Sequence, residues 1–490
     1  PQDNGRTFKF EITILVITLT IKNMKIKSLV TAFALTFAIS GWAAQPRYIF
    51  YFIGDGMGMG PVMAAATYNR TVLGSDELPL MMTFPVASQA MTYSASTPVT
   101  DSAAAGTALS TGHKTRNSML GVTPDSVPVY SMAEVLADNG YGVGVITSVA
   151  PDDATPGAFY AHVPKRSMYT DINRQFVDSK IDFLAGSDLR GLTDKDGNDT
   201  GILSLYKKNS SKIARGLDQY KSLDKSTGKI ILLDKEPFQD GNVGYTIDSI
   251  NGMLTLPQMT QTCLEFLEKK TPNRFFMMVE GGNIDHALHG NDGGSAIIEI
   301  FNFNEALKIA YDFYLAHPNE TLIVVTADHD TGGMTVGNAA NGYKVFFNYL
   351  QAQKVSKEMF SDYCKGILKS RRIYTWDDMK EYLQENLGFW TVIPLKEKET
   401  EKLHKEFIKV FDKRESKDQK TLYNDFNGFA KDVFQLLSTK AAIGWTTTSH
   451  TGNPVPVYAI GAGAENFAKI NNNIQIPVRI LDAAGYELKK

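Results

Sequence analysis

The sequence has no marked surplus of either charge. Its 490 residues include 50 lysines and arginines against 53 aspartates and glutamates, which gives a formal net charge of −3 at pH 7. Without a basic surplus, the composition does not favour nucleic acid as an obligate partner. Hydrophobic residues make up 43% of the chain, so we expect a globular protein with a large core.

Cysteine is scarce as well. Only Cys263 and Cys364 are present, so at most one disulfide can form within the chain. The sequence leaves open whether the two residues pair. A framework of several disulfides is excluded, and we expect the stability of the fold to come mainly from its core.

Long apolar runs are also missing near the N-terminus. The run at 29–39, which follows Met24 and two lysines, is shorter than the about 20 residues that span a membrane. Small residues suited to cleavage come after it, which predicts a signal peptide over 24–43; an uncleaved N-terminal anchor is the alternative. We interpret residues 1–23 as a non-native upstream extension. The mature chain is expected to lack a stable membrane span and to be periplasmic, or alternatively secreted or at the cell surface.

Five short apolar runs, rich in β-branched and aromatic residues, predict buried strands. They are RYIFYFIG, YGVGVITSV, RFFMMVEGG, TLIVVTAD and VPVYAIGAG. Segments of helical periodicity such as 131–139 and 296–313 separate several of them, which predicts an α/β fold with a mostly parallel sheet covered by helices. Acids and histidines cluster just past the last apolar residue of four runs, and one crevice at the carboxyl ends of the strands could gather them.

Residues 342–440 differ from the rest of the chain in composition and in the spacing of their apolar residues. This segment is charged, largely free of glycine and proline, and apolar at helical spacing. We expect an inserted helical subdomain within a domain that covers 44–490, with its aromatic side chains packed mainly into its own small core.

The stretch TDSAAAGTALSTGHKT places Ser102 directly after Asp101 and before a run of small residues. Taken alone, the pattern is typical of a helix N-cap, in which a side-chain oxygen accepts a hydrogen bond from the first turn. A nucleophilic serine at a helix N-terminus is the functional alternative, because the partial positive charge there favours a bound phosphate.

Possible metal ligands occur in several of the motifs. In IDHALH, Asp285 and His289 are four residues apart, which puts both side chains on one helix face. Asp328 and His329 are adjacent at a strand end, and His450 lies in SHTG. Mixed histidine and carboxylate ligands suit zinc. The oxygen-only candidates, which suit magnesium, are Asp55, Thr155 and Glu280.

Six motifs together resemble the alkaline phosphatase family: IGDGMG, TDSAAAGTALSTGHKT, DDATPGAFYAHVPKR, VEGGNIDHALH, TADHDTGG and SHTG, which follow one another in the family's order. The resemblance spans residues 47–462. It implies a three-layer α/β/α sandwich, a homodimer, and hydrolysis of small phosphate monoesters with two zinc ions, one magnesium ion and an alkaline pH optimum.

The resemblance also implies a role for each matched residue. Ser102 would be the nucleophile, carried through a phosphoserine intermediate, with Arg166 clamping the phosphate and Asp101 beside the substrate. The implied ligands are Asp285, His289 and His450 for the first zinc, Asp55, Asp328 and His329 for the second, and Asp55, Thr155 and Glu280 for magnesium, with Asp153 in or near that last shell.

One position departs from the family pattern. The best-known bacterial members have lysine where this chain has His286, whereas animal members have histidine there together with histidine at the position of Asp153. The mixed Asp153 and His286 pair bears on the occupancy of the third metal site and on the pH optimum. We expect His286 to act behind the ligands rather than on the metal.

Two rival functions follow from the same residues. A related enzyme could act on phosphodiesters or sulfate esters, although the sequence around Ser102 lacks the C/S-x-P-x-R pattern of a sulfatase. A non-catalytic exported protein could instead sequester metal or phosphate, but binding alone would not require an activated serine.

Overall fold

The computed structural model describes residues 45–226, 228–236, 244–250, 252–370 and 373–488. The described residues belong to one compact unit. The segments interpreted as an upstream extension and a signal peptide lie outside them. Among the helices in the described ranges, none combines the length and the apolar character needed to cross a membrane.

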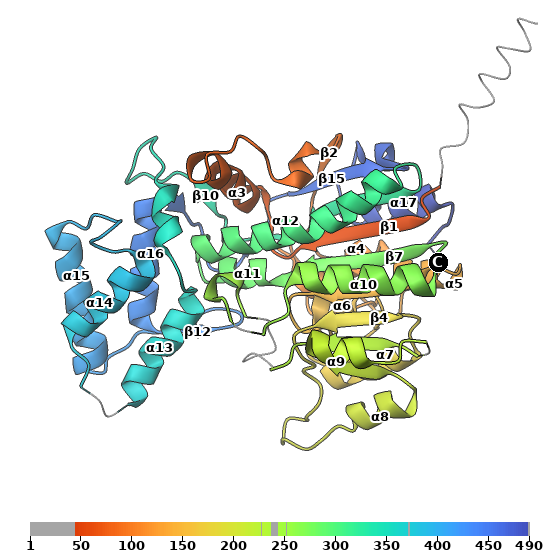
Figure 1. The fold of residues 1–490 in the computed structure, drawn as a ribbon, viewed down its shortest axis with the longest axis horizontal. Helices are drawn as coiled ribbons and strands as arrows, with labels where there is room; N and C mark the ends of the chain where they lie inside the picture. Colours follow the sequence, from red (N-terminus) through yellow and green to blue (C-terminus); the bar gives the residue numbers. More distant parts are fainter. Residues whose placement is uncertain (1–44, 227, 237–243, 251, 371–372, 489–490) are drawn as a thin grey trace, which may run out of the picture. The chain divides into compact units, whose positions relative to one another are not determined.

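A nine-stranded sheet runs through the centre of this unit (Figure 1). Its strands are β1 (Tyr48–Gly54), β2 (Val86–Ala90), β3 (Gly142–Thr147), β4 (Phe183–Gly186), β5 (Lys212–Arg215), β6 (Ile230–Leu233), β7 (Phe275–Gly281), β8 (Thr321–Ala327) and β15 (Val455–Gly461). They lie in the order β2-β15-β8-β1-β7-β3-β4-β6-β5. Only β15 is antiparallel to its two neighbours, β2 and β8, and the other pairs are parallel.

The five apolar runs of the sequence are β1, β3, β7, β8 and β15. Every residue of β1, β7 and β8 is buried, as expected of parallel strands covered on both faces. Strands β4, β5 and β6 have four residues each, too few for a clear periodic signal, and sequence analysis missed them together with the edge strand β2.

Helices cover both faces of the sheet, so the predicted three-layer α/β/α sandwich is confirmed. On one face, α4 (Ser102–Thr111), α5 (Met132–Asp138) and α17 (Gln475–Ala484) pack together, and on the other α3 (Met59–Thr71), α10 (Leu256–Lys270) and α12 (Gly293–Ala316) do so. The shorter helices are α6 (Ala154–Gly157), α7 (Tyr169–Asp178), α8 (Ile202–Lys208), α9 (Gly216–Ser222) and α11 (Gly282–His289).

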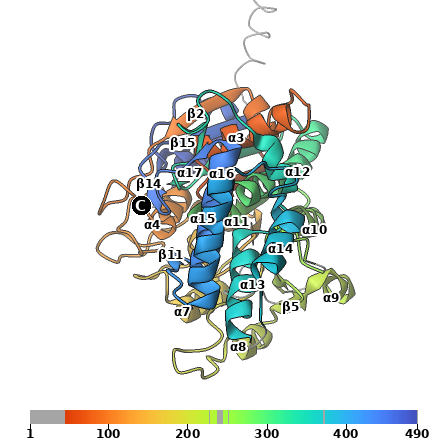
Figure 2. The same cartoon turned by 90° about the vertical axis from the view of Figure 1, so that its left-hand side faces the viewer.

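Helices also occupy the charged segment at 342–440. They are α13 (Lys357–Lys369), α14 (Trp376–Leu387), α15 (Glu397–Phe407) and α16 (Gly428–Ala441), and they face the viewer in Figure 2. Their core is aromatic: the Phe360 ring lies 5.5 Å from that of Tyr382 and 6.2 Å from that of Phe429. That this segment is an insertion into a family domain stays a prediction.

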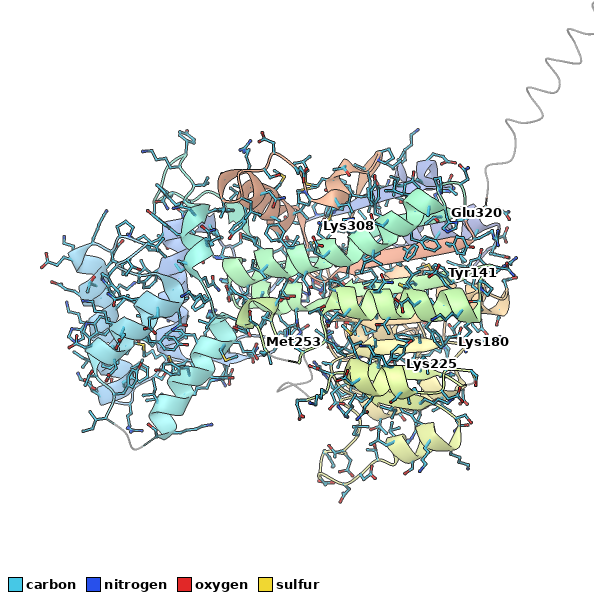
Figure 3. All side chains as sticks on the ribbon, in the orientation of Figure 1. Tyr141, Lys180, Lys225, Met253, Lys308 and Glu320 are labelled. Atoms are coloured by element: carbon cyan, nitrogen blue, oxygen red, sulfur yellow. The ribbon has the colours of Figure 1, made fainter. Side chains whose placement is uncertain are left out.

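The carboxyl ends of the parallel strands point toward these four helices. Figure 3 shows Tyr141 and Glu320, which precede β3 and β8, at the end of the sheet away from α13–α16. Cys263 in α10 and Cys364 in α13 are both buried free thiols, so they do not pair.

The aromatic core of the helices at 342–440 predicts different unfolding free energies for two alanine variants. Phe360→Ala should lower the free energy of unfolding by about 3–5 kcal/mol, because it removes a fully buried ring and leaves a cavity. Ile373→Ala, at a side chain that is 86% exposed, should change it by less than about 0.5 kcal/mol. Urea unfolding followed by circular dichroism measures both, and equal midpoints for the two variants would contradict this description of the core.

Candidate functional site

Three neighbouring strands deliver acidic residues to one edge of the sheet. The register sets Gly54 of β1 opposite Gly281 of β7 and Ala327 of β8, so these strands end side by side. Asp55 and Asp328 follow directly, Glu280 is the penultimate residue of β7, and all three are buried. Burial raises the pKa of Asp55, and the charges of Asp328, Asp285 and Glu280 raise it further, which indicates how closely the carboxylates are gathered.

Ser102 is the first residue of α4 but does not cap it. Asp101 is the N-cap, and its Oδ1 accepts a hydrogen bond from Ala104 N at 3.0 Å. The Ser102 hydroxyl instead lies 3.2 Å from His329 Nε2. The N-cap interpretation therefore holds for Asp101, and the role of Ser102 as a nucleophile stays a prediction.

Asp285 and His289 lie on one face of α11, as their spacing predicts. His289 Nε2 is 3.3 Å from Asp285 Oδ2. His450 reaches the same place through a two-residue strand β14 (His450–Thr451), which pairs with β9 (Asp330–Thr331). Its Nε2 lies 3.0 Å from that of His289, and its ring stacks on that of His329 at 3.6 Å.

A second group adjoins the first. His329 Nε2 lies 3.1 Å from Asp328 Oδ2 and 3.4 Å from Asp55 Oδ1. One ligand atom from each of these three residues lies within 4.8 Å of the other two, and the same holds for Asp285, His329 and His450. The six residues that the resemblance assigns to zinc are therefore brought together.

In their neutral forms, His289, His329 and His450 each carry the ring proton on Nδ1. Each Nε2 therefore carries a lone pair. Nδ1 of His289 and of His450 faces a backbone carbonyl, of Thr448 at 2.6 Å and of Thr100 at 2.9 Å, and a carbonyl can only accept. The Thr331 hydroxyl donates to Asp285, so it accepts from Nδ1 of His329, 3.2 Å away. Such partners orient histidines toward a metal.

A cation is required among these atoms. Two Nε2 lone pairs 3.0 Å apart repel one another unless a proton or a metal ion lies between them. In addition, Asp55 Oδ1, Asp285 Oδ2 and Asp328 Oδ2 are buried without a hydrogen-bond partner, which is costly for carboxylates unless a positive charge compensates. The donor set of imidazole nitrogens and carboxylate oxygens fits zinc.

The histidine pKa values respond to the same charges. Burial lowers the pKa of His289 and of His329, but the neighbouring Asp285 and Asp328 outweigh it and raise both. For His450, burial together with the charge of His329 lowers the pKa to about 3, so this imidazole is neutral near pH 7.

Oxygen donors form a third group beside β3 and β7. The Thr147 hydroxyl donates to Glu280 Oε2, and Thr155 in α6 is buried next to them. Burial raises the pKa of Glu280 to about 8, while the hydroxyls of Thr147 and Thr155 oppose the rise. Carboxylate and hydroxyl oxygens suit magnesium.

Arg166 is held by two carboxylates. Its Nη2 lies 3.0 Å from Asp153 Oδ1, and its Nη1 lies 3.7 Å from Asp101 Oδ2. Asp153 Oδ2 pairs in turn with Arg190 Nη2 at 3.3 Å. Burial alone would raise the pKa of Asp153, but Arg190 and Arg166 together lower it well below its usual range. Both Asp153 oxygens are thus engaged with arginines.

Arg190 and Tyr423 are the two residues that sequence analysis missed. Arg190 lies in SDLRG, outside every motif, and its local sequence carries no signal. Tyr423 belongs to the segment taken for a self-contained subdomain, yet its ring stacks on His286 with centroids 3.8 Å apart. Burial lowers the pKa of His286 to about 3, so the charge opposite Asp153 comes from the arginines and not from His286.

Comparison with known proteins agrees with this geometry. A family model described as alkaline phosphatase matches residues 47–486. Alkaline phosphatase 4 of Bacillus subtilis is 30% identical over 453 residues, covering 88% of this chain and 87% of the relative. The alkaline phosphatase of Schizosaccharomyces pombe is 27% identical over 464 residues, covering 89% of this chain and 81% of the relative.

Solved structures share the fold. A cold-active alkaline phosphatase from Shewanella sp. superposes with a TM-score of 0.74 at 25% identity, covering 89% of this chain and 99% of that one. The alkaline phosphatase from Thermus thermophilus superposes with a TM-score of 0.72 at 22% identity, covering 92% of this chain and 96% of that one. Because the family model spans most of the chain, the resemblance inferred from the sequence is confirmed: this protein belongs to the alkaline phosphatase family of phosphomonoester hydrolases.

Proposed function

We propose that the chain hydrolyses phosphate monoesters to an alcohol and inorganic phosphate through a phosphoserine intermediate on Ser102, with an alkaline pH optimum. The observation that carries the proposal is the 3.2 Å approach of Ser102 Oγ to His329 Nε2 at the N-terminus of α4. A hydroxyl in this position lies against a group of candidate metal-ligand atoms, and the preceding residue, Asp101, pairs with Arg166.

The metals of the proposal are two zinc ions and one magnesium ion. Asp285, His289 and His450 would hold one zinc, and Asp55, Asp328 and His329 the other. Glu280, Thr155 and Asp55 would hold the magnesium, with Asp153 acting through Arg166 and Arg190 because both its oxygens pair with them. When bound, such ions supply Lewis-acid charge that favours an alkoxide and neutralises phosphoryl oxygens.

The protein's own groups account for binding and attack. Ser102 Oγ releases its proton to solvent and forms the bond to phosphorus as the bond to the alcohol oxygen breaks, and solvent returns a proton to that oxygen. Water then attacks phosphorus and the bond to Ser102 Oγ breaks, with one proton of the water restoring the serine hydroxyl through solvent, so two inversions give net retention at phosphorus. The Arg166 guanidinium can donate to two non-bridging oxygens at once, and Asp101 and Asp153 fix its orientation.

We also propose that the protein is exported through the signal peptide predicted at 24–43 and acts as a periplasmic homodimer. The exported state is supported by the sequence pattern of that segment, and the dimer by family resemblance.

Ser102→Ala should abolish turnover without emptying the metal sites. We expect kcat for 4-nitrophenyl phosphate to fall by roughly 10³-fold or more, because the hydroxyl that would bond to phosphorus is gone, while bound zinc measured by atomic absorption stays unchanged. Ser110→Ala, at the other end of α4, is the matched control and should keep full activity. A wild-type rate in Ser102→Ala would contradict the phosphoserine intermediate, whereas a wild-type protein that binds phosphate and zinc but does not hydrolyse the ester would favour a storage protein.

Removing the metal should abolish activity reversibly, and the metal should be easier to remove at acid pH. A chelator is expected to stop hydrolysis between pH 7 and 10, and zinc to restore it. The raised pKa values of His289 and His329 mean that protons compete with metal as the pH falls, so zinc affinity should decrease toward acid pH. Zinc titrations at pH 5, 7 and 9 measure this, and an affinity that rises toward acid pH would refute it.

Arg166→Lys should weaken phosphate binding. A lysine cannot reproduce the paired donors of guanidinium, so kcat/KM should drop by about 10- to 100-fold and the inhibition constant of inorganic phosphate should rise. Arg174→Lys, at a half-exposed arginine paired with Asp171, is the control and should match the wild type. Equal inhibition constants for both variants would argue against the clamp.

A further inference from the structure

The helical segment sends a hairpin back to the metal ligands. Strands β11 (Gln419–Lys420) and β12 (Asp425–Phe426) are antiparallel, and the turn between them carries Tyr423. The hairpin is tied to α13, because Asn424 Nδ2 donates to Glu358 Oε2 at 2.8 Å and Lys357 Nζ donates to Gln419 Oε1 at 2.7 Å.

The same lysine ties the hairpin to the site. Lys357 Nζ also donates to Gly290 O at 2.7 Å, directly after His289, and it lies 4.5 Å from the centre of the Phe426 ring. The position of the hairpin turn relative to α11 is therefore determined by buried contacts on both sides of Tyr423.

The Tyr423 ring lies against two histidines of α11. It is parallel to His286, with an interplanar angle of 11° and centroids 3.8 Å apart, and it meets His289 edge-on at 5.2 Å. Its phenol lies near enough to Arg166 for the two groups to interact electrostatically. Tyr423 as a whole residue is only partly buried.

In-line displacement sends the alcohol oxygen out on the side of phosphorus opposite the attacking Ser102. Ser102 contacts His329, and from His329 the contacts continue through His450 to His289. Tyr423 contacts His289 and thus lies at the other end of this series of contacts from Ser102.

We propose that Tyr423 is a specificity-determining residue that forms the wall of the pocket on the leaving-group side and favours phosphate monoesters of planar, aromatic alcohols. This proposal rests on the proposed function for its substrate class. A planar ester group can pack against an aromatic ring, whereas a small alkyl group offers little contact area.

The test compares Tyr423→Leu, Tyr423→Phe and Leu422→Ala with the wild type. Leucine keeps apolar volume without an aromatic ring, phenylalanine keeps the ring without the hydroxyl, and Leu422 is the exposed neighbour on the same turn. For each protein, loaded with zinc and magnesium, kcat/KM is measured with phenyl phosphate and with ethyl phosphate. Dissociation constants of benzylphosphonate and propylphosphonate, in which a methylene replaces the bridging oxygen, give the same comparison without turnover.

We expect Tyr423→Leu to lower the ratio of kcat/KM for phenyl phosphate to kcat/KM for ethyl phosphate by roughly two- to tenfold. The same variant should bind benzylphosphonate more weakly, with a smaller loss for propylphosphonate. Tyr423→Phe and Leu422→Ala should keep the wild-type ratios. An unchanged ratio in Tyr423→Leu, including an equal loss for both substrates, would overturn the proposal and leave Tyr423 a packing residue. If the wild type hydrolyses neither ester, the proposed function fails, and the two phosphonates still decide whether Tyr423 selects aromatic groups.

Discussion

The aligned carboxyl ends of β1, β7 and β8 are the constraint on which the rest of the site depends. Their parallel register sets Gly54, Gly281 and Ala327 level with one another. Any acidic residue at the next position then joins the others within a few ångströms, in a place shielded by helices on both faces. Concentrating carboxylates in this way is unfavourable unless positive charge accompanies them, and the surrounding structure supplies it by several routes.

The groups that compensate these carboxylates come from different parts of the fold. The histidines, which can hold a cation, enter from α11, from β14 and from the residues between β8 and β9, each with its Nδ1 turned to a fixed acceptor and its Nε2 turned inward. Arg166 and Arg190 grip the two oxygens of Asp153 from separate segments. The Arg166 guanidinium is thereby held in position, which under the proposed function reduces the cost of ordering it when phosphate binds.

The helices at 342–440 are also part of this arrangement. Their aromatic core behaves as the sequence predicts, with Phe360, Tyr382 and Phe429 packed together. The hairpin that precedes α16, however, extends out of that core and brings Tyr423 onto α11. A segment that folds around its own apolar residues thus also contacts two histidines at the site.

The sequence by itself determined the fold class, the five long strands and most of the site, because each of these depends on local pattern. Apolar runs of seven residues predict β1, β7 and β8, and the spacing of Asp285 and His289 on one helix turn predicts that they face the same way. Tertiary structure alone decided that Asp101 caps α4 while Ser102 faces His329, that Cys263 and Cys364 remain apart, and that Arg190 and Tyr423 reach the site. Those outcomes depend on strand register and on packing between segments far apart in the chain, and no local pattern of side chains records either.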